Sequence, residues 1–204
     1  MRDRPQQGGR ALSSPGAEVV RVVVANRHAR FRCDRGSLAR AFHLLAARQG
    51  ELRPRAAAPG PEITGELSLV FLSDPALARL HADYLGDPTP TDVITFAGDR
   101  ALGTAGEICV SVDAALRQVD RRARGRFASS ALADEITLYL VHGWLHLLGH
   151  DDLVPTRKRA MRRAEASALG FLRRNAALPR LGLRPAPPPR KKLRVTRRSW
   201  NRST

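Results

Sequence analysis

Two histidines separated by four positions, His142 and His146, lie within an apolar stretch of the chain. Residues at positions i and i+4 lie one turn apart on the same face of an α-helix, so one cation could bind both imidazoles. Gly149 can adopt the left-handed backbone conformation that ends a helix, and a histidine and two aspartates follow it. A third ligand from this turn would complete a site with three protein ligands and one open position, which is typical of catalytic zinc.

The histidine spacing alone has two other interpretations. Pairs of histidines at this spacing also occur in helices without any metal, either in the core or on the surface. The same spacing occurs in HExxH metalloproteases, in which a glutamate directly after the first histidine acts as the general base. Gly143 occupies that position here, so the peptidase interpretation lacks its base.

The composition is strongly basic: the 204 residues carry 35 Lys and Arg against 19 Asp and Glu, a formal net charge of +16. This balance indicates a polyanionic partner, most simply nucleic acid, although a basic composition without a binding role would look the same. Cys33 and Cys109 lack CxxC spacing, so they indicate no disulfide framework and fit a reducing compartment. No apolar stretch is long enough to span a membrane and no secretory signal is present, so we expect a cytoplasmic protein.

The elements that must position the histidines can be predicted from apolar patterning. Short β-branched or alternating stretches predict four strands, at residues 19–24, 66–72, 93–96 and 106–112. Helical spacing and capping residues predict helices at residues 38–47, 74–84, 113–122, 130–148 and 155–169, the first capped by Ser37 and the last ended by Gly170. The third and fourth strands are expected to form an antiparallel hairpin. The fold class predicted is α+β: a mixed four-stranded sheet packed against several helices, with the metal site at the end of a central helix.

Composition also predicts the domain boundaries. Residues 1–17 are polar and glycine-rich and predict a disordered leader, and residues 18–172 are expected to form the single folded domain. Residues 173–204 contain eleven Lys or Arg, no acid and several prolines, which predicts a disordered basic tail. Such a tail could serve only solubility, but we favour RNA tethering. The predicted RNA-binding residues are Arg190, Lys191, Lys192, Arg194, Arg197 and Arg198.

The stretch from His142 to Asp152 resembles the signature of the YbeY family, bacterial metal-dependent endoribonucleases of ribosomal RNA maturation. The family pattern is H-G-x-L-H-L-x-G-x-D-H, and only its last histidine is replaced, by Asp152. Residues 90–96 and 106–111 resemble the family's P-T-D-V-L-S-F and G-D-I-x-I-S segments, and Met161 and Glu165 match its final helix. The resemblance covers roughly residues 19–170.

This resemblance implies one zinc ion held by His142, His146 and Asp152, with His150 as a competing third ligand two residues too early for the family geometry. A carboxylate is an acceptable zinc ligand, although its charge should make a bound water less acidic than a third histidine would. The open position would carry the water that attacks a phosphodiester, and no general base is assigned.

The function implied by the resemblance is a single-strand-specific, zinc-dependent endoribonuclease. It would act in rRNA maturation, at the 3′ end of small-subunit rRNA, and in ribosome quality control, with RNA and ribosomal particles as partners. The alternative is a non-catalytic, RNA-binding ribosome-assembly factor that retains a structural metal site. The oligomeric state is not predicted.

The chain departs from the family at one further position. Leu85 stands where the family has an arginine that is important for RNA handling. Arg79 and Arg100 are nearby in sequence and are candidates to replace it.

Other residues of the matching segments have two interpretations each. Thr91 and Asp92 could act in catalysis or form only a turn that fixes the following strand. Glu107 could orient a metal-binding histidine or face solvent from its strand. Trp144 lies on a different helix face from the histidines and is predicted to pack in the core.

Overall fold

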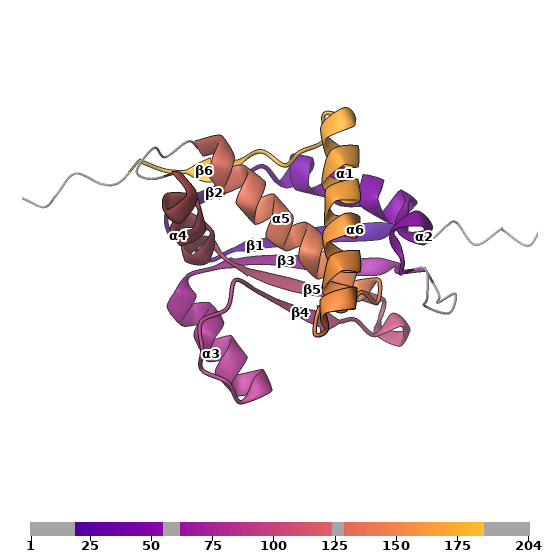
Figure 1. Cartoon of the computed structure of the whole chain (residues 1–204), viewed down its shortest axis with the longest axis horizontal. Helices are drawn as coiled ribbons and strands as arrows, with labels where there is room; N and C mark the ends of the chain where they lie inside the picture. The colour runs from indigo at the N-terminus through magenta and orange to yellow at the C-terminus, as the bar shows by residue number, and fades with distance from the viewer. Residues whose placement is uncertain (1–18, 55–61, 124–128, 186–204) are drawn as a thin grey trace, which may run out of the picture.

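The chain forms a mixed four-stranded sheet with helices on both faces, which confirms the predicted fold class (Figure 1). The computed structural model describes residues 19–54, 62–123 and 129–185. The strands follow the order β1 (Val20–Asn26), β3 (Gly65–Leu72), β5 (Thr104–Ser111) and β4 (Val93–Ala97). β1, β3 and β5 are parallel, whereas β4 is antiparallel to β5, as expected for the predicted hairpin.

The helices divide between the two faces of this sheet. They are α1 (Arg35–Ala47), α2 (Gln49–Leu52), α3 (Asp74–Leu85), α4 (Val112–Ala123), α5 (Ser129–Leu147) and α6 (Pro155–Arg174), with a 3-10 turn, η1 (Arg100–Leu102). In Figure 1, α1, α5 and α6 lie above the sheet and α3 lies below it. None of the helices in the described ranges is long and apolar enough to cross a bilayer.

The sequence of β3 explains why both faces are covered. Leu67, Leu69 and Phe71 are fully buried in the larger core, which also contains Trp144 of α5. Val70 lies on the opposite face in a second cluster with Leu77 of α3, because successive side chains of a strand point to opposite sides. The burial of Trp144 agrees with its predicted packing role.

Gly143 lies where α5 packs closely against the sheet. A Cβ at this position would lie 2.6 Å from Cγ2 of Ile108 on β5 and 2.9 Å from Oγ1 of Thr95 on β4. Real Cβ atoms essentially never approach other atoms this closely, so the packing requires glycine. The glutamate of an HExxH peptidase could not occupy this position, which gives a structural reason to reject that interpretation.

Two predicted helix boundaries were wrong. The cap of α1 is Asp34 rather than Ser37: Asp34 Oδ1 accepts a hydrogen bond from the Ser37 backbone N–H at 2.7 Å, so the helix begins three residues earlier than predicted. Gly170 does not end α6, which continues to Arg174. Leu172 is buried beyond that glycine, and its burial outweighs the cost of about 1 kcal/mol for glycine inside a helix.

The predicted start of the tail at residue 173 was also wrong. Residues after α6 form a further strand, β6 (Leu181–Leu183), which pairs antiparallel with β2 (Phe31–Cys33). Ala177 is buried, and Leu181 and Leu183 pack against the larger core. The folded domain therefore includes residues 173–185. The strand in this segment has only three residues and lies among glycine, proline and arginine, so its sequence did not predict it. The predicted leader at 1–17 and residues 186–204 lie outside the described residues.

Candidate metal centre

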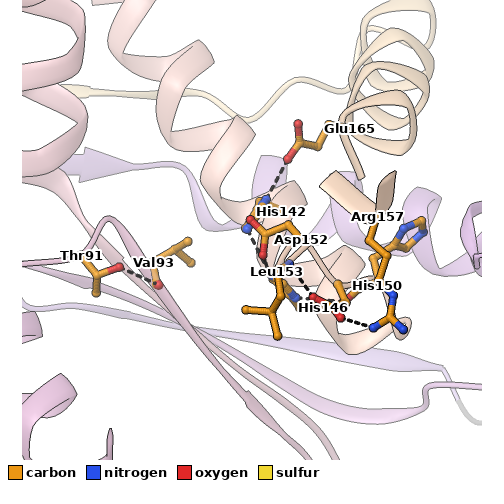
Figure 2. A network of polar contacts seen from close by, with 10 residues as sticks. Thr91, Val93, His142, His146, His150, Asp152, Leu153, Arg157 and Glu165 are labelled. Carbon is orange, nitrogen blue, oxygen red and sulfur yellow. Dashed lines mark hydrogen bonds and ion pairs between the residues drawn. The ribbon is translucent and has the colours of Figure 1, made fainter. Parts of the chain in front are cut away.

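Three candidate ligands come together at the C-terminal end of α5 (Figure 2). His142 and His146 occupy consecutive turns of the helix, and their Nε2 atoms lie 2.9 Å apart. Oδ1 of Asp152 lies 3.9 Å from Nε2 of His146. One ligand atom from each of the three residues lies within 4.8 Å of the others, so a single ion could contact all three.

The turn after α5 returns Asp152 to the histidines. Gly149 has a φ of +93°, a left-handed conformation that suits glycine, as predicted for the helix end. The backbone N–H of His150 donates to the carbonyl of Leu145 at 3.0 Å, which closes the turn. Asp151 then fixes the outgoing loop, because it accepts a hydrogen bond from the Leu153 N–H at 2.7 Å.

Both histidines are oriented through their Nδ1 atoms. Nδ1 of His142 lies 2.7 Å from Oε1 of Glu165 on α6, and Nδ1 of His146 lies 3.0 Å from the backbone carbonyl of His150. Because these partners accept hydrogen bonds, each Nδ1 carries the proton and donates it. The lone pairs then remain on the two Nε2 atoms, which face each other. This is the arrangement that residues around metal-binding histidines usually impose.

His150 does not point into the site. Its Nε2 lies 2.6 Å from the backbone carbonyl of Leu52 on α2, and the residue is buried. The geometry therefore favours Asp152 over His150 as the third ligand. His150 contributes instead through its carbonyl, which orients His146.

The electrostatics of the pair also suit a cation. Burial lowers the pKa of His142, but the carboxylates of Glu165, Asp152 and Asp92 together raise it above its ordinary value. Burial and the neighbouring His142 lower the pKa of His146. Two protonated rings cannot be accommodated at this separation, whereas one divalent cation satisfies both lone pairs. The donor set of two imidazoles and one carboxylate fits zinc.

A cleft of about 900 Å³ opens beside these residues. It is called the α4 cleft here, and its lining includes Asp92, Arg117, Arg121, Tyr139, His142 and Glu165. Arg117 pairs with Asp74, and Arg122, which also lines the cleft, pairs with Glu135. Arg121 has no ion pair within the described ranges. The sequence analysis missed these α4 arginines, although the i, i+4 spacing of Arg117 and Arg121 was a readable signal.

Comparison with known proteins identifies the family. A family model described as endoribonuclease YbeY matches residues 38–173. The chain belongs to the YbeY family. Endoribonuclease YbeY of Chlamydia muridarum is 42% identical over 120 residues, covering 56% of this chain and 71% of the relative. Endoribonuclease YbeY of Chlamydia trachomatis serovar D is 40% identical over 129 residues, covering 60% of this chain and 74% of the relative.

One solved structure is also similar. The solution structure of TM1509 from Thermotoga maritima covers 78% of this chain and 94% of that chain, with 16% sequence identity and a TM-score of 0.43.

Glu107 and Asp92 each had two possible roles in the sequence analysis of this YbeY-family chain. Glu107 has its hydrogen-bond partner in Cys109, with Sγ and Oε1 3.5 Å apart, and Glu165 rather than Glu107 orients a histidine. Asp92 fixes the neighbouring strand, since its carbonyl accepts a hydrogen bond from the Ser111 N–H at 2.8 Å. It also lines the α4 cleft, and its role in catalysis stays a prediction. Matching of the family's final helix was the signal that pointed to Glu165.

The structure describes only some of the residues that were predicted to contact RNA. Neither Arg79 of α3 nor Arg100 of η1 lines the α4 cleft, so the structure does not place either of them in the role of the missing family arginine. Leu85 is the last residue of α3. The six predicted RNA-binding residues between 190 and 198 lie outside the described residues and remain a prediction.

Proposed function

We propose that this protein is a zinc-dependent endoribonuclease that cuts single-stranded RNA in rRNA maturation, including the 3′ end of small-subunit rRNA, and in ribosome quality control. The proposal includes action in the cytoplasm on ribosomal particles. The observation that carries it is the 2.9 Å approach of the His142 and His146 Nε2 atoms beside Asp152, at the edge of a cleft lined with arginines. Membership of the YbeY family supports the same conclusion.

The residues of the site divide the work of such a reaction. His142, His146 and Asp152 would hold one zinc ion, which when bound acts as a Lewis acid and lowers the pKa of a water molecule. Glu165 holds His142 in the tautomer that presents Nε2. The negative charge of Asp152 lowers the net charge of the site relative to three neutral histidines.

The α4 cleft supplies the groups that would hold the RNA backbone. Guanidinium groups bind phosphate oxygens through paired hydrogen bonds, and Arg121, which lines this cleft, forms no ion pair among the residues described. Arg117 and Arg122 are held in place by their carboxylate partners. The α4 arginines therefore provide the phosphate contacts that the family arginine replaced by Leu85 would otherwise make.

The decisive variant is His146→Ala in the full chain. We expect loss of bound zinc and of cleavage of single-stranded RNA, with the fold and the RNA affinity retained. His43→Ala is the matched control, since His43 is exposed on α1. Retained cleavage by a zinc-free His146→Ala protein would refute the proposal. If neither protein cleaves RNA but both support ribosome assembly, the non-catalytic assembly factor is the correct function.

A further inference from the structure

A second cleft lies on the other side of the loop that carries Asp152. It has a volume of about 950 Å³ and is lined by the end of α2 and the two residues after it, by the turn after α5, and by α6 between Thr156 and Ser167. We name it the α2–α6 cleft, and its polar lining includes Glu51, Arg53, Asp151, Arg157, Arg163 and Ser167. In Figure 2, Thr91 and Val93 of the α4 cleft lie to one side of the histidines, and Arg157 lies to the other.

The α4 cleft includes the candidate ligand His142, and the α2–α6 cleft comes close to another candidate ligand, Asp152. Asp151 lines the α2–α6 cleft, and its neighbour Asp152 belongs to the candidate ligand group. His150 lines the same cleft but is fixed by its 2.6 Å contact with the Leu52 carbonyl, which ties α2 to the loop. The α6 side of the cleft combines the small residues Ala160 and Ala164 with the guanidinium groups of Arg157 and Arg163.

The charge of this cleft favours an anionic ligand. Its two acids are already paired, Asp151 with Arg157 and Glu51 with Arg48. Arg163 is exposed and has no ion pair in the ranges that the structure describes. The first half of α6 adds three more exposed cations, Lys158, Arg159 and Arg162, and no acid precedes Glu165. A polyanion is therefore attracted along this edge of the molecule.

The loop between the ligands and α6 also exposes apolar surface. Leu153 is 87% exposed and Val154 is 44% exposed, directly after Asp152. Exposed apolar side chains next to a basic groove suit single-stranded nucleic acid, whose unstacked bases present apolar faces. A protein partner would gain less from the exposed cations of α6 between Lys158 and Arg163, which are three arginines and one lysine.

We propose that the α2–α6 cleft binds the ribose-phosphate backbone of the RNA strand on the side of the cleaved bond opposite to the α4 cleft. This inference rests on the proposed function. An endonuclease cuts an internal bond, so its substrate must leave the metal centre in two directions, and the α4 cleft accounts for only one. Arg163 is the principal contact for the phosphates of the RNA in the α2–α6 cleft. Arg157 positions the loop that carries Asp152 through its ion pair with Asp151.

The test compares Arg163→Glu with Arg32→Glu, an equal charge reversal on the exposed face of β2, outside both clefts. Both changes are made in the full-length His146→Ala protein so that bound RNA is not cut. The probes are oligouridylates of about 4 and about 12 nucleotides, which bracket a short and an extended binding site. Affinity is measured over a range of salt concentrations.

We expect Arg163→Glu to weaken binding of the longer strand roughly tenfold. The slope of log affinity against log salt concentration for that strand should become shallower by about 0.7 for each lost phosphate contact. Binding of the short strand should be unchanged, and Arg32→Glu should alter neither. Equal losses for both lengths, or equal effects of the two reversals, would show a general charge effect and overturn the inference. Failure of the proposed function is recognised separately, by the absence of zinc-dependent cleavage in the protein without substitutions.

Discussion

Nδ1 of His142 and Oε1 of Glu165 lie 2.7 Å apart although 23 positions separate the two residues in the chain. The contact joins α5 to α6, and both side chains are largely buried. It fixes the ring of His142 and determines which nitrogen carries its proton. The packing of the final helix thereby controls how one candidate ligand is presented.

Replacement of Glu165 should weaken metal binding without loss of the fold. Glu165→Gln retains a hydrogen-bond acceptor but removes the charge that makes the imidazole a better ligand. We expect zinc affinity to fall about 10- to 100-fold. Competition with a chelator of known affinity measures this change. Glu107→Gln is the matched control and should bind zinc normally, whereas equal losses in both variants would contradict the role given to Glu165.

The third ligand can be identified by zinc content. Asp152→Ala should lose most of its bound zinc, because two imidazoles alone make a weak site. His150→Ala should keep zinc but unfold at a lower temperature, since it loses the buried hydrogen bond to the Leu52 carbonyl, worth about 1 kcal/mol. Elemental analysis measures the zinc content and thermal unfolding measures the stability. The first should fall in Asp152→Ala, and only the second should fall in His150→Ala. Full zinc occupancy in Asp152→Ala would exclude that residue as a ligand.

Gly143→Ala should destabilise the protein because its new methyl group would meet Ile108 and Thr95. We expect a loss of about 1–3 kcal/mol in the free energy of unfolding, typical of overpacking. Gly50→Ala is the control, since no atom lies within 4 Å of a Cβ at that position and its φ is not left-handed. Denaturant titration should show an unchanged or slightly higher stability for Gly50→Ala.

Two truncations distinguish the folded C-terminal strand from the residues beyond it. A chain ending at Pro185 keeps β6 and should unfold as the full chain does. A chain ending at Arg174 loses the burial of Ala177, Leu181 and Leu183, and should be less stable by about 2 kcal/mol or more. If the predicted tail binds RNA, the chain that ends at Pro185 should also bind RNA with a weaker dependence on salt. The slope of log affinity against log salt concentration should be shallower by about 0.7 for each lost phosphate contact.

Asp34 should contribute stability that disappears in acid. The Ser37 backbone N–H, followed by the Arg180 guanidinium, lowers the pKa of Asp34 in the folded protein. A lowered pKa stabilises the fold above the pKa of the unfolded chain, about 4, and this stabilisation is lost as pH falls through the folded value. Asp34→Asn should therefore unfold at a lower temperature at neutral pH. The difference between the two proteins should shrink in acid, and a constant difference would contradict the assignment.

Local patterns accounted for much of the fold. The alternation in β3 and the β4–β5 hairpin depend on neighbours in sequence, so the strands and their antiparallel pairing could be predicted. The same is true of His142 and His146, whose helical spacing places them together. The end of the helix at Gly149 followed from the conformational freedom of glycine.

Contacts between distant segments could not be predicted from such patterns. The hydrogen bond of His150 to Leu52 spans 98 positions and turns that ring away from the candidate site. Nothing in the neighbourhood of His150 indicates this partner. The pairing of β6 with β2 was missed for the same reason, and the role of Glu165 could be suspected only from its match to the family's final helix.

The pairing of Phe31 with Leu183 has a consequence for the synthesis of the protein. The partner of β2 is translated about 150 residues later, so a nascent chain emerging from the ribosome holds an incomplete core until Leu183 has been added. During that interval β2 presents an unpaired edge, which a chaperone or another chain can reach.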